Sequence, residues 1–239
     1  MRIAVVSDIH DNRTALEAVL VDLRETSPDL VLHGGDLVHG GSSPVEVLDQ
    51  IRALGWPGVL GNTDEMLFRP EALTEFASRL PQLQHMFAMI EEMAAYTRAV
   101  LGEERLAWLA SLPRNQIVDQ IGLVHATPDS LWRAIMPEAS DEELDGIYSP
   151  LGKPIAIYAH IHRPFIREMA TLTVMNTGSV GLPQDGDRRA CYLLLDDKTP
   201  TIRRVEYDVD KELKALSLSG LPHKDWCARM LHSASPQMP

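Results

Sequence analysis

Short apolar runs alternate with amphipathic segments through the first third of the chain. Residues 3–7, 30–33 and 58–60 form the apolar runs, which are typical of buried strands. A helix is predicted after Asn12 or Thr14, either of which could cap it, and a second helix is predicted from Pro44. Strands that alternate with helices indicate βαβ units, so this part of the chain predicts a largely parallel sheet.

The pattern changes between residues 66 and 113, where Glu, Ala, Leu and Met dominate. This composition predicts two or three helices, the last over about residues 103–112, and no strand. We interpret the segment as a helical insertion or cap on an α/β domain. The alternative is that these helices only pack on the sheet.

Apolar runs return in the second half, at residues 116–125, 155–159, 171–176, 190–196 and 201–207. Fewer helical patterns separate these predicted strands, so more of their pairing is expected to be antiparallel. Further helices are predicted from Asp210 and over residues 225–231. The whole chain, residues 1–239, is expected to form a single domain.

Composition narrows the classes of protein that the chain can belong to. The formal net charge is −12, which disfavours binding to a nucleic-acid polymer. Two cysteines do not make a disulfide framework, and no segment looks like a signal peptide or a membrane span. We therefore expect a cytoplasmic protein without a membrane partner, and the sequence leaves a homo-oligomer open.

Potential metal ligands follow the predicted strands, at the ends where loops of an α/β fold converge. Each has an ordinary alternative role as a cap, a turn residue or a structural histidine. Taken together, however, they supply the imidazole, carboxylate and amide groups that divalent metals of intermediate hardness prefer. Residues 8 and 10, and residues 160 and 162, are two positions apart, so an extended segment would point both side chains of each pair to the same side. The set is Asp8, His10, Asp36, Asn62, His125, His160 and His162.

The motifs around these residues resemble those of the calcineurin-like metallophosphoesterase superfamily. They are D-I-H at residues 8–10, G-G-D at 34–36, G-N-T-D at 61–64, the isolated His125 and A-H-I-H at 159–162. The sequence N-T-G-S-V-G at residues 176–181 is similar to that of compact bacterial and archaeal phosphodiesterases of this superfamily. The resemblance implies an α/β fold with two mixed sheets in α-β-β-α layers, carrying the helical insertion.

The resemblance also implies a site with two divalent ions, drawn from Mn, Fe, Zn, Ni or Co. Asp8, His10 and His162 would hold one ion, and Asn62, His125 and His160 the other, with Asp36 between them. A hydroxide bridging the ions would attack phosphorus. Asp36 and Asn62 are accordingly expected to be catalytic.

Many members of the superfamily carry a histidine, thought to be a general acid, where this chain has Thr63. A threonine hydroxyl is too weak an acid for that role near pH 7. His39 is a candidate substitute, although it could equally be an ordinary loop residue. Asn12, Arg163 and Arg188 (or Arg189) are candidate substrate-binding residues, and Asp64 could either orient a metal-binding histidine or cap a helix.

These observations favour a metal-dependent phosphodiesterase or phosphatase that acts on a small phosphorylated substrate. A nucleotide or a dinucleoside polyphosphate is one such substrate. The alternative is a catalytically weak metal-binding scaffold of the same fold that serves protein interactions. The complete set of ligands favours the enzyme.

Overall fold

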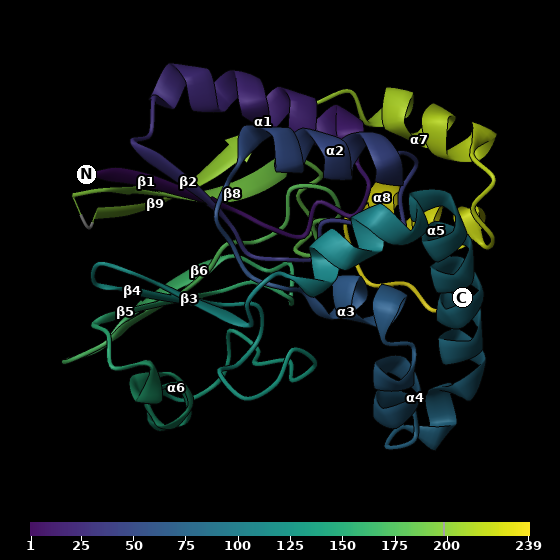
Figure 1. Cartoon of the computed structure of the whole chain (residues 1–239). Coiled ribbons are helices and arrows are strands. Elements are labelled where there is room, and N and C mark those ends of the chain that lie inside the picture. Colours follow the sequence, from purple (N-terminus) through teal and green to yellow (C-terminus); the bar gives the residue numbers. More distant parts are fainter. Residues whose placement is uncertain (198) are drawn as a thin grey trace.

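Two β-sheets lie face to face, with helices on their outer sides and at one end (Figure 1). The structure is a computed structural model that describes residues 1–197 and 199–239. Its layers confirm the predicted two-sheet α/β architecture. No helix in the described part of the chain combines the length and apolar character needed to cross a membrane.

The first sheet, as far as it is described, has four strands in the order β2-β1-β8-β9. Strand β1 pairs in parallel with β2 and antiparallel with β8, and β8 pairs antiparallel with β9. The strands are β1 (Arg2–Val6), β2 (Leu30–His33), β8 (Ala190–Asp196) and β9 (Thr199–Val205).

The second sheet, over the same described residues, has five strands in the order β3-β4-β5-β7-β6. Its centre, β4-β5-β7, is parallel, and both edge strands pair antiparallel with their neighbours. The strands are β3 (Asn115–Val118), β4 (Ile121–Val124), β5 (Ile155–Tyr158), β6 (Phe165–Glu168) and β7 (Thr173–Asn176).

Alternate side chains of the central strands build separate layers of the core. Ile3 and Val5 of β1 point between the sheets, whereas Ala4 and Val6 point to the helices outside. Such a strand is buried on both faces, which explains its continuous apolar run. The two core layers, one between the sheets and one under the outer helices, thereby hold the ends of β1, β2, β4 and β5 in fixed positions.

The helices cover three sides of the sandwich. Figure 1 shows α1 and α2 over the first sheet, α7 beside the end of α1, α6 beneath the second sheet, and α3, α4, α5 and α8 grouped at one end. Gly102 interrupts α5 with a left-handed φ of 72°, which separates the predicted last helix of the 66–113 segment from the preceding one. The helices are α1 (Arg13–Thr26), α2 (Pro44–Leu54), α3 (Asn62–Phe68), α4 (Glu71–Ala77), α5 (Gln84–Ala110), α6 (Asp141–Tyr148), α7 (Val209–Leu218) and α8 (Lys224–Ser233), with the 3-10 turns Pro81–Leu83 and Ser149–Leu151.

Several predicted elements differ in the structure. Residues 58–60 do not form a strand; Gly58 makes only an isolated bridge to His33. The predicted single strand over residues 116–125 is a hairpin of β3 and β4, because Asp119 adopts a left-handed turn with φ 51°. Strand β6 and helix α6 were not predicted.

His33, at the end of β2, is a buried histidine that lacks hydrogen-bond partners for either ring nitrogen within the described residues. Burial lowers its pKa to about 4 from the ordinary 6.5. As the pH falls, His33 is therefore protonated in the unfolded chain before it is protonated in the folded protein, which favours unfolding. Between pH 7 and pH 5, this difference should lower the unfolding free energy of the metal-free protein by about 2 kcal/mol.

Urea denaturation of the metal-free wild type and His33→Leu at both pH values measures this contribution. Subtracting the two pH dependences removes the effect of the other histidines. The substitution should remove about 2 kcal/mol of the loss between pH 7 and pH 5. Identical pH dependences in the two proteins would show that His33 titrates normally.

Candidate metal centre

The loops that follow β1, β2, β4 and β5, together with the start of α3, meet at one edge of the sandwich. They bring together every residue of the predicted ligand set. The side chains are buried, apart from a partly exposed His160. The set comprises Asp8, His10, Asp36, Asn62, His125, His160 and His162.

The spacing of two had suggested an extended backbone in these loops, but their backbone is not extended. Asp8 and His10 have φ of 51° and 47°, and His160 and His162 have φ of 67° and 55°. Asp36 is also left-handed, with φ 50°. Non-glycine residues in this region cost about 1–3 kcal/mol each, and such strain concentrates at functional sites. Here it turns side chains from successive loop residues into one small volume.

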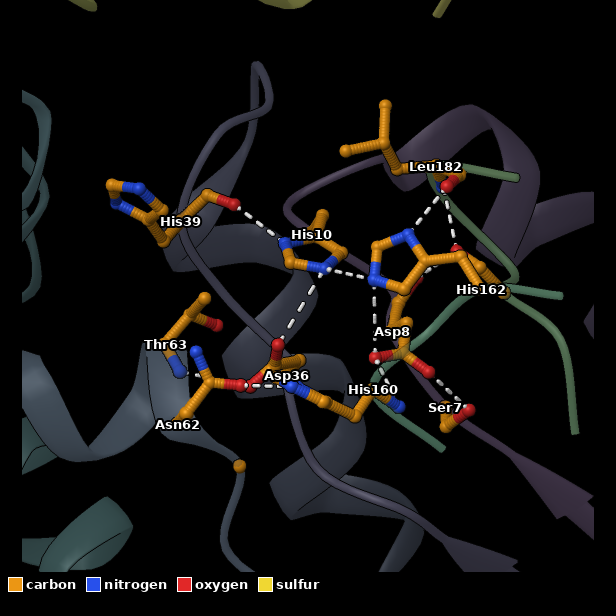
Figure 2. A network of polar contacts seen from close by, with 12 residues as sticks. Ser7, Asp8, His10, Asp36, His39, Asn62, Thr63, His160, His162 and Leu182 are labelled. Carbon is orange, nitrogen blue, oxygen red and sulfur yellow. Dashed lines mark hydrogen bonds and ion pairs between the residues drawn. The ribbon is translucent and has the colours of Figure 1, made fainter. Parts of the chain in front are cut away.

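One group of side chains consists of Asp8, His10, Asp36 and His162, each offering a ligand atom within 4.8 Å of the others. The Nε2 atoms of His10 and His162 are 3.2 Å apart. His162 Nε2 lies 3.3 Å from Asp8 Oδ1, and His10 Nε2 lies 3.7 Å from Asp36 Oδ2. Figure 2 shows these atoms facing one another.

The second group contains Asp36, His125 and His160. Asn62 belongs with them, because its Oδ1 lies 2.9 Å from His125 Nε2 and 2.8 Å from His160 Nδ1. Asp36 Oδ1 lies 3.4 Å from His125 Nε2. Asp36 thus turns one carboxylate oxygen to each group, which is the geometry of a shared ligand.

Backbone carbonyls determine which histidine nitrogens carry protons. The Nδ1 atoms of His10, His125 and His162 donate to the carbonyls of His39, Gly34 and Leu182, at 2.9, 2.8 and 2.6 Å respectively. A carbonyl can only accept, so each neutral ring presents an unprotonated Nε2 to the centre. Lone pairs of nitrogen and oxygen would then face each other, and a cation between them relieves the repulsion. The donor set fits divalent metal ions.

Burial and neighbouring groups shift the pKa of two of these residues in ways that suit ligands. Burial opposes ionisation of Asp8, but the surrounding histidines, His162 foremost, together outweigh burial and hold the pKa of Asp8 below its usual value. Burial lowers the pKa of His160 to about 4, so its ring is neutral near pH 7. Carboxylates and neutral imidazoles are the forms that bind metals.

Buried polar residues that the sequence analysis missed hold the loops in place. Ser7 donates its hydroxyl to Asp8 Oδ2 at 2.6 Å. Asp11 accepts the backbone N–H groups of His39 and Gly41, at 2.9 and 3.3 Å, and burial raises its pKa to about 8. Both residues flank the D-I-H motif, and that proximity was the only signal for them in the sequence.

Asp64 caps α3 and does not orient a histidine. Its carboxylate accepts the N–H groups of Leu37, Val38 and Gly61, at 3.0, 3.3 and 3.1 Å. It therefore fastens the loop after Asp36 to the start of α3. Burial raises the pKa of Asp64 to about 7.

Comparison with known families identifies the fold and the family. The model of the calcineurin-like phosphoesterase superfamily domain matches residues 1–199. The chain belongs to this superfamily. The resemblance found in its motifs is thereby confirmed, and membership suggests a phosphoester hydrolase.

Individual relatives support the assignment over nearly the whole chain. An uncharacterized protein of Methanocaldococcus jannaschii is 31% identical, and the alignment covers 96% of each chain. The crystal structure of a metallophosphoesterase from Sphaerobacter thermophilus is 27% identical with a TM-score of 0.79, covering 98% of this chain and 100% of that one. A hypothetical protein from Pyrococcus horikoshii shares the fold at 21% identity, with a TM-score of 0.84 and 99% coverage of both chains.

Thr63 occupies the position where many calcineurin-like phosphoesterases have a histidine. Its backbone N–H donates to Asp36 Oδ1 at 2.9 Å, and its hydroxyl donates to the Val38 carbonyl at 3.0 Å. The residue therefore supports the shared carboxylate. Its hydroxyl is already engaged and does not substitute for a proton-donating histidine.

His39 lines a cavity next to the metal-binding residues, and its ring is almost fully buried. Figure 2 shows its carbonyl turned to His10 and its ring turned away. Burial, together with the nearby His10, lowers the pKa of His39 to about 3. A neutral ring at pH 7 is a weaker proton donor than an imidazolium. The position of His39 therefore suits a general acid, whereas its lowered pKa does not.

The predicted substrate-binding residues are not gathered at one place. The side-chain amide of Asn12 is hydrogen-bonded within the protein: Oδ1 accepts from Ala15 N at 2.9 Å, and Nδ2 donates to Gly181 O at 2.8 Å and to Tyr207 Oη at 3.2 Å. A hydrogen bond from Nδ2 to a substrate oxygen would have to replace one of the last two. Arg163 lines a cavity of about 520 Å³ that includes His160, and pairs with Glu138 at 3.0 Å. Arg188 is exposed and lines neither this cavity nor the one that contains His39.

Proposed function

We propose that this protein is a hydrolase of small phosphoesters that works with two divalent metal ions. One observation carries the proposal: two groups of buried acceptor atoms converge from separate loops and share the carboxylate of Asp36. Asp8, His10 and His162 would hold one ion, and Asn62, His125 and His160 the other. Mn, Fe, Zn, Ni and Co all suit this mixture of nitrogen and oxygen ligands.

The protein's own contribution is to fix the ligands before substrate binds. The His39 and Leu182 carbonyls orient the rings of His10 and His162, and Thr63 N–H fixes Asp36. The bound ions would supply a hydroxide nucleophile near pH 7 and neutralise charge on the phosphoryl oxygens. Because the ligands sit on short loops anchored by the sheets, little reorganisation is needed during the reaction.

The remaining predictions belong to the same proposal. The substrate is a small phosphorylated molecule, for which Arg163 is the better placed of the two predicted arginines. The metal site alone does not distinguish among such molecules, so nucleotides and dinucleoside polyphosphates remain candidate substrates. The two cysteines are buried free thiols, which suits a reducing cytoplasm.

The test is a comparison of metal-free and reconstituted protein. The chelated protein is loaded with each of the five metals, its metal content is measured by plasma mass spectrometry, and hydrolysis of bis(p-nitrophenyl) phosphate and p-nitrophenyl phosphate is followed. The proposal expects about two ions per chain and metal-dependent turnover. Two bound ions without turnover on either ester would instead support the interaction scaffold.

His39→Ala tests the predicted substitute for the missing histidine. If His39 protonates the leaving group, the substitution should lower kcat by about 100-fold for esters of poor leaving groups, such as simple alcohols. It should lower kcat less for p-nitrophenyl esters, because nitrophenolate departs without a proton. Equal losses on both kinds of ester would remove this role for His39.

A further inference from the structure

We propose that this enzyme prefers phosphoesters that carry one compact, uncharged apolar group, and that this group occupies an apolar chamber beside the metal-binding residues. The proposal rests on the proposed function and names its substrate class. The chamber together with the metal-binding end that opens into it has a volume of about 310 Å³. Apolar protein cavities of about 150 Å³ hold a benzene ring, so an aryl or branched alkyl group fits.

The walls of the chamber come from separate parts of the chain. Helices α3, α4 and α5 supply one wall, the loop after β4 supplies Trp132, and α8 supplies the other wall. Figure 1 shows α3, α4, α5 and α8 together at the end of the sandwich. The apolar lining includes Leu73, Phe76, Phe87, Ile90, Trp132 and Trp226.

The two indole rings in the lining present carbon surface to the chamber, because their N–H groups are already engaged. Trp132 Nε1 donates to Glu65 at 2.8 Å, and Trp226 Nε1 donates to the Gln237 carbonyl at 2.7 Å. The ring of Trp132 also packs on Phe76, with centroids 5.1 Å apart. These groups cannot read the polar edge of a nucleobase, but they can bury an apolar group.

Charge in the chamber is confined to the metal-binding end. Among the described residues that line it, Asp36 is the acid, and there is no Lys or Arg. His10, Asp36, Asn62, His160 and His162 form this end, so a phosphoryl group there lies next to the apolar walls. A polyphosphate chain would bring further negative charges to walls that hold no cationic side chain. The lining therefore favours one phosphoryl group and one apolar group over dinucleoside polyphosphates.

Three diesters with the same leaving group test this preference: methyl, benzyl and 5′-thymidyl p-nitrophenyl phosphate. In each, the second ester oxygen is bonded to a CH₃ or CH₂ carbon, so their intrinsic reactivity is similar. Burial of the phenyl ring should raise kcat/KM of the benzyl ester about thirtyfold over the methyl ester. The thymidyl ester should not exceed the methyl ester by more than about threefold. A benzyl preference below threefold, or a thymidyl ester hydrolysed faster than the benzyl ester, would overturn the proposal.

Binding gives a readout that does not depend on turnover. In metal-loaded protein, calorimetry should show benzylphosphonate binding about thirtyfold more tightly than methylphosphonate. Fluorescence should respond to the benzyl compound, because Trp132 and Trp226 line the chamber. Equal dissociation constants for the two phosphonates would overturn the proposal.

Ile90→Arg and Val100→Arg form a matched pair on α5. Ile90 lines the chamber, whereas Val100 is exposed and lies outside it. Ile90→Arg should reduce the benzyl-to-methyl ratio about tenfold, and Val100→Arg should leave it at the wild-type value. Equal ratios in both variants would contradict the assignment of the chamber, and melting temperatures show whether each variant is folded. If Ile90→Arg does not fold, Ile90→Ala, which removes apolar surface, should lower the ratio about threefold.

Failure of this inference differs from failure of the proposed function. If metal-loaded protein hydrolyses all three diesters at similar rates, the enzyme assignment stands and the substrate preference is wrong. If it hydrolyses none of them while benzylphosphonate still binds more tightly, the chamber stands and the hydrolase assignment is wrong.

Discussion

Asp36→Asn is expected to remove both metal ions and to lower kcat/KM by more than a hundredfold. The two carboxylate oxygens of Asp36 face different groups of ligands, with Oδ2 towards His10 and Oδ1 towards His125. An asparagine keeps the size but removes the charge, and its NH₂ would point donors at a metal. Loss of residues that merely support metal ligands costs about 10–100-fold, so loss of the shared ligand should cost more.

Variants that change only one of the two ligand groups provide a comparison for Asp36→Asn. His10→Ala touches one group of ligands and His125→Ala the other, so each should retain about one ion per chain, whereas Asp36→Asn should retain none. Asp49→Asn is the matched control, because Asp49 is a partly exposed residue of α2 that pairs with Arg105 away from the site. It should keep both ions and full activity. One retained ion in Asp36→Asn would show that the carboxylate is not shared.

The positions of most candidate ligands were predictable, because they follow local signals in the sequence. Asp36 follows a short apolar strand and two glycines, and His125 ends another apolar strand. A strand end of this kind can be recognised from a few consecutive residues, without knowledge of the rest of the fold. The left-handed backbone of Asp8 and His10 could not be read from their spacing, because it depends on bonds to a distant loop: Ile9 N and His10 N both donate to the Asp36 carbonyl.

Elements at the periphery were harder to predict for a related reason. Strand β6 is an edge strand whose sequence, FIRE, has no buried residue and no clear alternation. Helix α6 starts with three acidic residues and contains Gly146, which weakens its helical pattern. The roles of Asp11 and Asp64 depend on backbone amides from distant loops. The apolar chamber combines Phe76, Phe87 and Trp226, and periodicity alone does not distinguish a packed face from one that borders a cavity.

Gly61→Ala is expected to separate the loops that carry Asp36 and Asn62. A Cβ on Gly61 would lie far inside contact distance of both the backbone nitrogen and Oδ1 of Asp36. The neighbouring atoms are backbone and the carboxylate of Asp36, the proposed shared ligand, so no flexible side chain can move aside. A displacement of about 1 Å at a catalytic group can cost about 100-fold in rate, and overpacking costs about 1–3 kcal/mol of stability.

Gly146→Ala provides the control, because a Cβ there meets no atom within 4 Å. It lies in α6, where alanine should add about 0.5–1 kcal/mol of unfolding free energy without changing metal content or kcat. Urea denaturation, metal analysis and turnover of bis(p-nitrophenyl) phosphate compare the two variants. Gly61→Ala should lose metal and about 100-fold in kcat/KM. If it kept two ions and wild-type turnover, the close approach of these loops would not be what positions Asp36.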